Sequence, residues 1–201
     1  MSGDRRCPMT ARVAAVARVV AVARVEVVAR GAADSRGPRP ETRRPASFYA
    51  DPVAWLIVDA VEDALRDPAG PGEGLRRDGS EVGVVSISEV ATRHTMRQMS
   101  AGVHRGRVSP LRFAGANPGS IAGLPCIVLG FRGPSLVLSM PPAAGRPVAE
   151  SIGRAWLASG ACRFVVVNEH EADSDDAHTV RTRVLALADV AEGRTNAPVG
   201  P

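Results

Sequence analysis

The sequence contains no lysine: all 25 basic residues in this chain of 201 are arginine, against 21 acidic residues, for a formal net charge of +4. Arginine suits phosphate recognition because its planar guanidinium matches the spacing of phosphate oxygens. The arginines are scattered among acids, however, and aromatic residues make up only 3% of the chain, so no platform for stacking bases accompanies them. An arginine-rich nucleic-acid-binding protein is therefore only a minor alternative, and no nucleic-acid partner is expected.

Cysteine and long apolar runs are also scarce. The three cysteines, Cys7, Cys126 and Cys162, are far apart and form no C-x-x-C pair, which argues against a disulfide framework or a zinc site and favours a reducing cytoplasm. A membrane-spanning helix needs roughly 18 or more apolar residues in a row. The Ala/Val-rich N-terminal segment is broken by arginine at every sixth position, so no membrane association is expected.

What is present is the composition of a globular α/β domain, with 45% hydrophobic and 23% charged residues. The β-branched segment RVVAVARVEVVAR predicts a strand over about residues 19–29, because a six-residue spacing keeps its arginines on one face of a strand. Asp51 and Pro52 predict the start of a helix through Asp67, which the segment 68–74 ends. We divide the chain into a loose leader (1–15), a folded domain (16–171), and an acidic loop with a C-terminal tail (172–201).

Strands and helices alternate through the middle of the chain. The residue patterns predict strands at 81–88, 136–140 and 164–168 and helices at 89–101 and 148–159; the run 124–129 is strand-like, and the type of the run 180–190 stays open. Such alternation indicates a mainly parallel sheet covered by helices.

Four passages between Glu81 and Glu171 resemble, in the same order, the N-terminal half of the β-ketoacyl synthases of the thiolase superfamily. They read VGVVSIS, VSPLRFAGANPGSIAG, LPCIVLGFRGPSLVLS and IGRAWLASGACRFVVVNE. The resemblance implies an α/β, thiolase-like layered fold of which this chain holds the N-terminal half only. Half of such a fold should expose a large apolar face that something else covers.

The chain differs from the family at the positions of the catalytic residues. The resemblance places Pro142 at the position of the acyl-accepting cysteine, and proline carries no nucleophile. Pro141 and Pro142 also lack the amide N–H that would stabilise an oxyanion. The glycine-rich histidine motifs of the family's second half are missing too. We therefore assign no catalytic residue, treat Pro142 as a degenerate nucleophile position, and expect no cofactor.

Metal-ligand side chains gather only in the segment EHEADSDDAH, from Glu169 to His178. Histidine and carboxylate are suitable ligand types, but such clusters are usually solvated loops. We interpret this segment as an acidic loop and assign no metal site.

The resemblance implies a truncated chain-length factor of a type II polyketide synthase of the polyene kind. Such a subunit is non-catalytic, forms a heterodimer with a ketosynthase, and shapes the acyl tunnel. The residues it implies for the dimer interface are Asn117, Leu136, Val137, Leu138, Ser139 and Met140. Those implied for tunnel and chain-length gating are Thr92, Thr95, Met96 and Met99, and exposed arginines such as Arg105, Arg107 and Arg112 are candidates for transient docking of an acyl carrier protein.

Other interpretations stay open. An enzymatic one is a small ketosynthase-like acyltransferase or decarboxylase with an unrecognised nucleophile, for which Cys126 and Cys162 are candidates. A reactive thiolate would be labelled by iodoacetamide, whereas nucleic-acid binding would weaken steeply with salt. A homodimer of vestigial domains is a further possibility.

Overall fold

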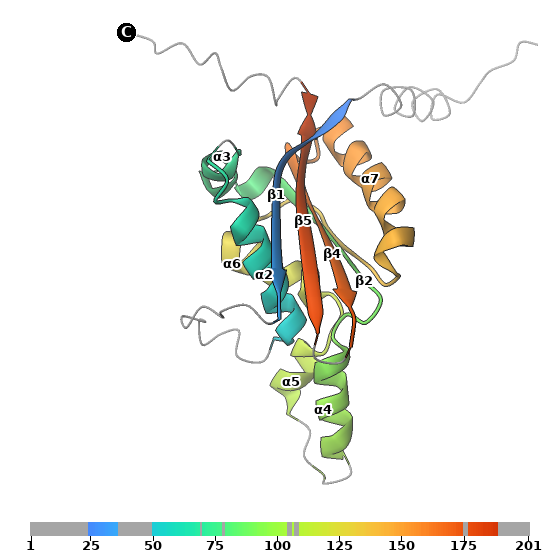
Figure 1. Cartoon of the computed structure of the whole chain (residues 1–201). Helices are drawn as coiled ribbons and strands as arrows, with labels where there is room; N and C mark the ends of the chain where they lie inside the picture. The colour runs from blue at the N-terminus through green and yellow to red at the C-terminus, as the bar shows by residue number, and fades with distance from the viewer. Residues whose placement is uncertain are drawn as a thin grey trace, which may run out of the picture.

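The computed structural model describes residues 24–35, 50–68, 70–77, 79–103, 106, 109–174 and 177–188. Its centre is a five-stranded sheet in the order β1-β5-β4-β2-β3 (Figure 1). The strands are β1 (Val25–Asp34), β2 (Val82–Ser88), β3 (Ser135–Leu138), β4 (Phe164–Ala172) and β5 (His178–Leu187). Because β2 is parallel to β3 and β4, and β5 is antiparallel to β4 and β1, only β5 runs against the other four.

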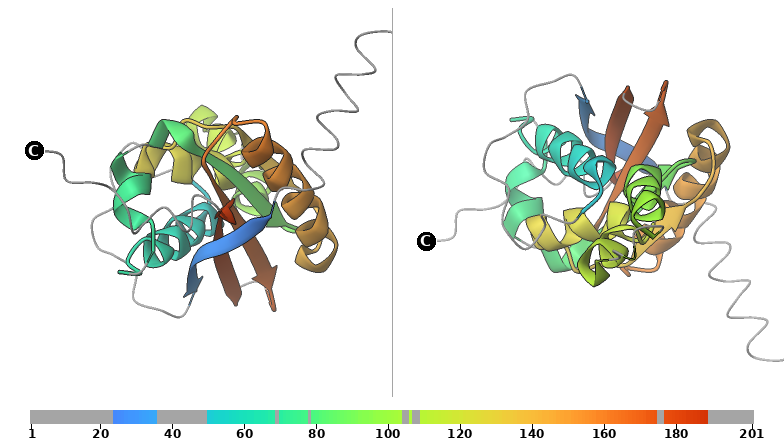
Figure 2. Two further views of the ribbon diagram at one scale, coloured as in Figure 1. Left: turned by 90° about the horizontal axis from the view of Figure 1, so that it is seen from above. Right: turned by 90° about the horizontal axis from the view of Figure 1, so that it is seen from below.

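Helices cover both faces of the sheet. On one face lie α2 (Pro52–Ala64) and α6 (Ser120–Leu129), and on the other lies α7 (Pro142–Ala158) (Figures 1 and 2). Strand β4 shows the division, since Val166 packs in the α2 core and Val165 in the α7 core. Strand β2 is buried along its whole length, which explains its continuous apolar sequence. This confirms the predicted layered α/β fold.

The prediction for helix α2 is confirmed at its first residues. Asp51 precedes the helix, and its Oδ1 accepts a hydrogen bond from the Val53 amide at 2.9 Å. Pro52 occupies the first helical position, where the missing N–H costs nothing. Three shorter α-helices, α3 (Gly72–Arg77), α4 (Arg93–Val103) and α5 (Pro110–Gly115), and the 3-10 helix η2 (Gly79–Glu81) complete the described helical structure. None of the described helices has the length and apolar character to span a membrane.

The first strand lies later than predicted. Strand β1 extends to Asp34, five residues beyond the expected end; residues 19–23 lie outside the described part of the chain. Two contacts of the extension hold it beside α2. Gly31 lies so close that a Cβ there would stand 2.3 Å from the Ala60 carbonyl oxygen, and the Ala32 amide donates to Asp63 Oδ2 at 3.1 Å.

The segment 172–201 is not simply a loop and tail. It contributes β5, which pairs with both β1 and β4 inside the sheet, so the undecided run 180–190 is mostly strand. The proposed boundary after Glu171 therefore divides one sheet. The sequence is ambiguous here because Arg181, Thr182 and Arg183 interrupt the apolar run and so weaken the apolar signal.

Two further segments differ from their predicted type or length. The run containing Cys126 is part of helix α6, which ends at Gly130 in the left-handed region with φ 75°. A six-residue apolar run does not by itself distinguish a strand from a buried helix. Helix α7 starts at Pro142 instead of Val148, since prolines are tolerated in a first turn, and α4 starts at Arg93, four residues after the predicted Glu89.

Candidate functional site

The candidate site is the edge of the sheet where the parallel strands β2, β3 and β4 end. Helix α4 follows β2 and helix α7 follows β3, so both begin at this edge. The segment after Ser88 and the segment after Leu138 are therefore brought together although they are far apart in the sequence. In α/β sheets this is the edge at which ligands and catalytic groups are usually held.

Helix α7 begins with the two prolines. Pro142 is buried at the first helical position and Pro141 precedes it as the N-cap. One turn further on, the amides of Ala144 and Gly145 both donate to the Pro141 carbonyl at 3.0 Å. Because proline has neither a nucleophilic side chain nor an amide N–H, Pro142 supplies neither group at the position that the resemblance assigns to the cysteine.

A chain of buried polar side chains lies at the same edge. Ser88 Oγ is 2.7 Å from His170 Nδ1, and His170 Nε2 is 3.0 Å from His178 Nδ1. The Ala91 amide also donates to Ser88 Oγ at 2.7 Å. In the tautomer that satisfies every contact, Ser88 donates its hydroxyl proton to His170, and His170 donates from Nε2 to His178.

This arrangement corrects the interpretation of the segment Glu169–His178 as a solvated loop. His170 is 1% exposed in β4, and its ring stacks on that of His178 in β5. Burial, and secondarily the charge of His178, lowers the pKa of His170 to about 4, so the ring is neutral near pH 7. The described residues contain no group of three or more potential metal ligands, and Asp175 and Asp176 lie outside them.

The residues implied as chain-length gates divide into two kinds. Thr92 and Thr95 are buried: the Thr92 hydroxyl donates to the Ala116 carbonyl at 2.6 Å, and the Thr95 amide donates to Asp51 Oδ2 at 3.0 Å. Met96, in contrast, is 48% exposed, and Met99 is half-buried. The two threonines thus join α4 to the body of the protein, while Met96 faces outward.

The residues implied for the dimer interface lie at or near an open edge. Strand β3 has β2 on one side and no other described strand on the other. Its residues Leu136, Val137 and Leu138 are half-buried, as is Met140, whereas Ser139 is exposed. Asn117 is exposed away from this strand, where its Oδ1 accepts from the Gly119 amide at 2.8 Å.

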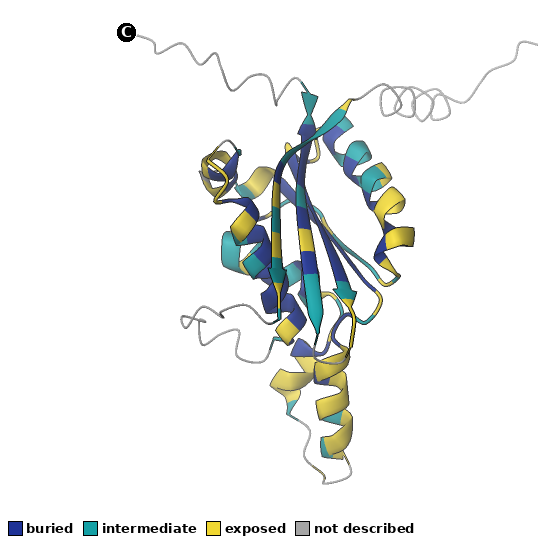
Figure 3. Ribbon diagram, viewed as in Figure 1, coloured by how far each residue is buried: buried dark blue, intermediate teal, exposed yellow. Residues whose placement is uncertain are grey.

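Helices α4 and α5 protrude from the sheet edge and are largely exposed (Figure 3). Four apolar side chains on them stand in solvent: Met96, Val103, Leu111 and Phe113, the last 69% exposed. Arg112 Nη1 donates to Gln98 Oε1 at 3.0 Å and so joins the two helices, while Arg105 and Arg107 lie outside the described residues. We call these two helices the α4–α5 lobe.

The sequence analysis missed an ion-pair network beneath the start of α7. Glu169, 3% exposed, accepts from Arg146 of α7 and from Arg183 of β5, each with a shortest contact of 2.6 Å. Arg183 also donates to Glu150 at 2.8 Å. Burial alone would raise the pKa of Glu169, but the hydrogen bonds and charges of the two arginines outweigh it and lower that pKa. The alternation of Arg181 and Arg183 along β5 was the only sequence signal for it.

Neither cysteine in the described residues is activated. Burial raises the pKa of Cys126 and raises that of Cys162 to about 11. Because the thiolate is the nucleophile, both side chains are unreactive thiols at neutral pH.

Comparison with known proteins defines the class of fold. No protein-family model matches the sequence, and no curated protein matches it either. Solved structures do match. They include the ishigamide ketosynthase/chain length factor, with a TM-score of 0.66 and 13% identity over 84% of this chain and 63% of that chain. They also include a β-ketoacyl synthase from Burkholderia phymatum, with a TM-score of 0.67 and 14% identity over 88% of this chain and 62% of that chain. A ketosynthase in complex with its chain length factor from Xenorhabdus doucetiae also matches, with a TM-score of 0.58 and 15% identity over 82% of this chain and 79% of that chain.

The chain therefore has the ketosynthase-like thiolase fold. It spans less than two thirds of the length of the ishigamide and Burkholderia proteins. With identities this low, the likeness establishes the fold, and the function needs a separate argument.

Proposed function

We propose that this protein is a non-catalytic chain-length-factor subunit that binds a ketosynthase and completes its acyl tunnel in type II polyketide biosynthesis, of the polyene kind. The observation that carries the proposal is the start of α7. There Pro142, which the resemblance assigns to the nucleophile position, is the first residue of the helix and carries neither a nucleophilic group nor an amide N–H. A ketosynthase-like fold without a nucleophile acts through binding instead of acyl transfer.

Two surfaces near the carboxyl ends of β2 and β3 support a partner. On one side of β3 no other described strand pairs with it, and such a backbone edge is a template for pairing with a strand of another chain. The α4–α5 lobe exposes Met96 and Phe113, and methionine gives an adaptable apolar surface for an acyl chain. Two solved neighbours, one a ketosynthase with its chain length factor and one a ketosynthase with its acyl carrier protein, support a ketosynthase and an acyl carrier protein as the expected partners.

The enzymatic alternative finds less support. It needs a nucleophile with a base within hydrogen-bond reach, yet the thiols of Cys126 and Cys162 have raised pKa values. Ser88 does contact a histidine, but its side chain is fully buried. Substrate therefore has no access to that pair.

The test is co-expression with a ketosynthase encoded beside this protein, followed by size-exclusion chromatography with light scattering. We expect a one-to-one complex that Phe113→Asp disrupts, because the substitution puts a carboxylate into an apolar contact. Ile127→Asp is the matched control, since Ile127 is 77% exposed but lies on α6, away from the α4–α5 lobe. A protein that elutes unchanged in the presence of the ketosynthase would overturn the proposal.

Chain length supplies a second readout. In a complex with active ketosynthase, Met96→Trp should shorten the product, since it narrows the tunnel end that the proposal assigns to α4. An unchanged product distribution from an intact complex would remove Met96 from the gating set.

A further inference from the structure

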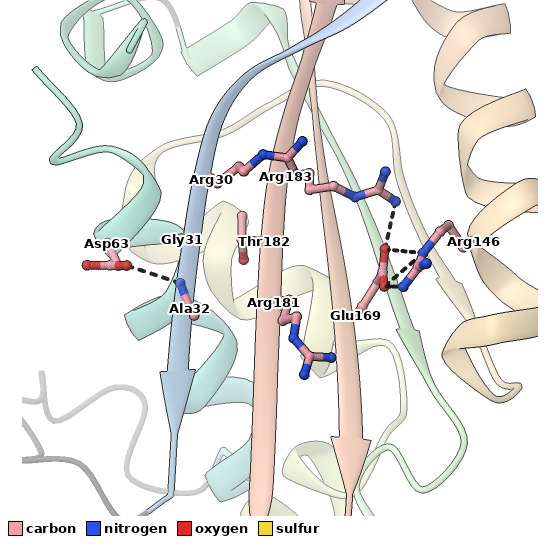
Figure 4. A pocket seen from close by; sticks show the side chains of 9 residues that line it. All are labelled: Arg30, Gly31, Ala32, Asp63, Arg146, Glu169, Arg181, Thr182 and Arg183. Atoms are coloured by element: carbon pink, nitrogen blue, oxygen red, sulfur yellow. Dashed lines mark hydrogen bonds and ion pairs between the residues drawn. The ribbon is translucent and has the colours of Figure 1, made fainter. Parts of the chain in front are cut away.

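Four arginines line a pocket around strands β1 and β5 that the proposed function does not use. The pocket has a volume of about 530 Å³ and is lined from β1, β4, β5 and the helices α2 and α7 (Figure 4). Arg30, Arg146, Arg181 and Arg183 stand against only two lining carboxylates, Asp63 and Glu169. Its size is that of a small-molecule site.

Two of these arginines lie directly opposite one another in the sheet. Arg30 and Arg183 are directly opposite one another in the β1–β5 ladder, so their side chains share one face of the sheet. Like charges in directly opposed positions destabilise a sheet. Arg183 is compensated by Glu150 and Glu169, but no ion pair or side-chain hydrogen bond joins Arg30 to any other described residue.

Arg181 and Arg146 have N–H donors that their ion pairs do not use. Arg181 binds Glu171 through Nη1 and is 59% exposed, and Arg146 binds Glu169 through Nε and Nη2 and is 48% exposed. A guanidinium has five N–H donors, so each has unused ones. Figure 4 shows these side chains distributed around the hollow over β5, with Ala32 contributing only a methyl group to its wall.

We propose that this pocket binds a small molecule carrying a phosphate or diphosphate group, with Arg30 and Arg181 as its principal contacts. Guanidinium groups recognise phosphate through paired hydrogen bonds, and a bound anion would give Arg30 the counter-charge that no described residue supplies. An acidic protein segment shares this charge, but side chains from five elements line a hollow of small-molecule size, which favours the smaller ligand. The inference is independent of whether the protein pairs with a ketosynthase.

The experiment is an NMR titration of the full-length chain with inorganic pyrophosphate at constant ionic strength, adjusted with sodium chloride. We expect saturable shifts of the arginine Nε–Hε signals and of the Arg30 and Ala32 amides. The double variant Arg30→Ala/Arg181→Ala should weaken binding by at least about tenfold, since it removes two charge-assisted contacts. Arg76→Ala on α3 is the matched control, being an exposed arginine outside the pocket, and should bind like the unaltered chain.

Three outcomes would overturn the inference: shifts that do not saturate, shifts of equal size in all variants, or saturable binding of a polyglutamate peptide without binding of pyrophosphate. The urea midpoint of the double variant shows separately whether its fold is intact. Arg181 pairs with Glu171 only at the exposed surface, so we expect that midpoint to lie close to that of the unaltered chain.

Discussion

Asp51 joins the two parts of the molecule on which the proposed function depends. Its carboxylate is fully buried; Oδ1 accepts from the Val53 amide at the start of α2, and Oδ2 accepts from the Thr95 amide of α4. Thr95 is the one buried residue of α4 among those described, so this bond is a main attachment of the α4–α5 lobe. Asp51→Ala removes both acceptors and leaves two buried amides without partners.

The magnitude follows from the two contacts. Loss of an N-cap costs about 1 kcal/mol, and a buried donor left unsatisfied costs about 1–3 kcal/mol more. Asp51→Ala should therefore lower the free energy of unfolding by about 2–4 kcal/mol, which for a domain of this size lowers the Tm by several degrees. Urea unfolding followed by tryptophan fluorescence measures this, because one of the two tryptophans, Trp55, is buried in the same helix.

Asp51→Asn provides the matched control. Asparagine keeps one acceptor oxygen and can therefore serve only one of the two amides. We expect about half of the Asp51→Ala effect, together with faster hydrogen exchange at one of the amides of Val53 and Thr95. A loss under about 1 kcal/mol in Asp51→Ala, or equal losses in both variants, would refute this account of how α4 is attached.

Three further predictions concern buried groups. The pKa of His170 falls from 6.5 to about 4 on folding, so the unfolded chain binds a proton at higher pH than the folded chain does. The free energy of unfolding should therefore drop by up to about 3 kcal/mol as the pH falls from 6.5 to 4. In the variant His170→Asn, the urea midpoint should change less over this pH range. Gly145→Ala should lower the free energy of unfolding by about 1–3 kcal/mol, because the new Cβ would stand 2.4 Å from Ile87 Cγ2. Gly153→Ala should raise it by about 0.5–1 kcal/mol, because the nearest atom to the new Cβ is 3.4 Å away. Chemical denaturation of the two variants measures the difference. Cys162, with a pKa of about 11, should resist iodoacetamide at pH 7.5 in the native chain and react after unfolding, as mass spectrometry of the peptide would show.

The sequence predicts those helices and strands well in which the residues that the structure buries are apolar and the ends carry recognisable capping residues. Helix α2 has a capping aspartate, a proline at its first position and a continuous apolar stripe, and β2 is apolar because both of its faces are covered. The type of the run that forms β5 stays open in the sequence because Arg181 and Arg183 on one face of the strand interrupt its apolar pattern. Contacts distant in sequence make it a strand, through its pairing with β1 and β4.

The candidate site shows the same division. A local motif and its spacing assign Pro142 to the nucleophile position through the resemblance, whereas the sequence predicts the start of the helix only at Val148. The contact of Ser88 with His170 joins residues 82 positions apart, and Arg183 reaches Glu169 only because β4 and β5 are neighbours. Such pairs have no local signature, and they were interpreted from the sequence as a solvated acidic loop.

Half of a layered fold is expected to expose one large apolar face, but the α7 side of this sheet is apolar at one end and charged further along. On the α7 side of the sheet, one end of β1 and β5 carries half-buried apolar residues such as Val25 and Leu187, whereas further along Arg30 and Arg181 stand in solvent. A face that carries guanidinium groups is compatible with water and does not require an apolar cover. The large exposed apolar side chains are concentrated instead on the α4–α5 lobe, at the sheet edge where Pro142 begins α7. Hydrophobic association should therefore bring a partner to that edge, while the arginine face remains open to an anion.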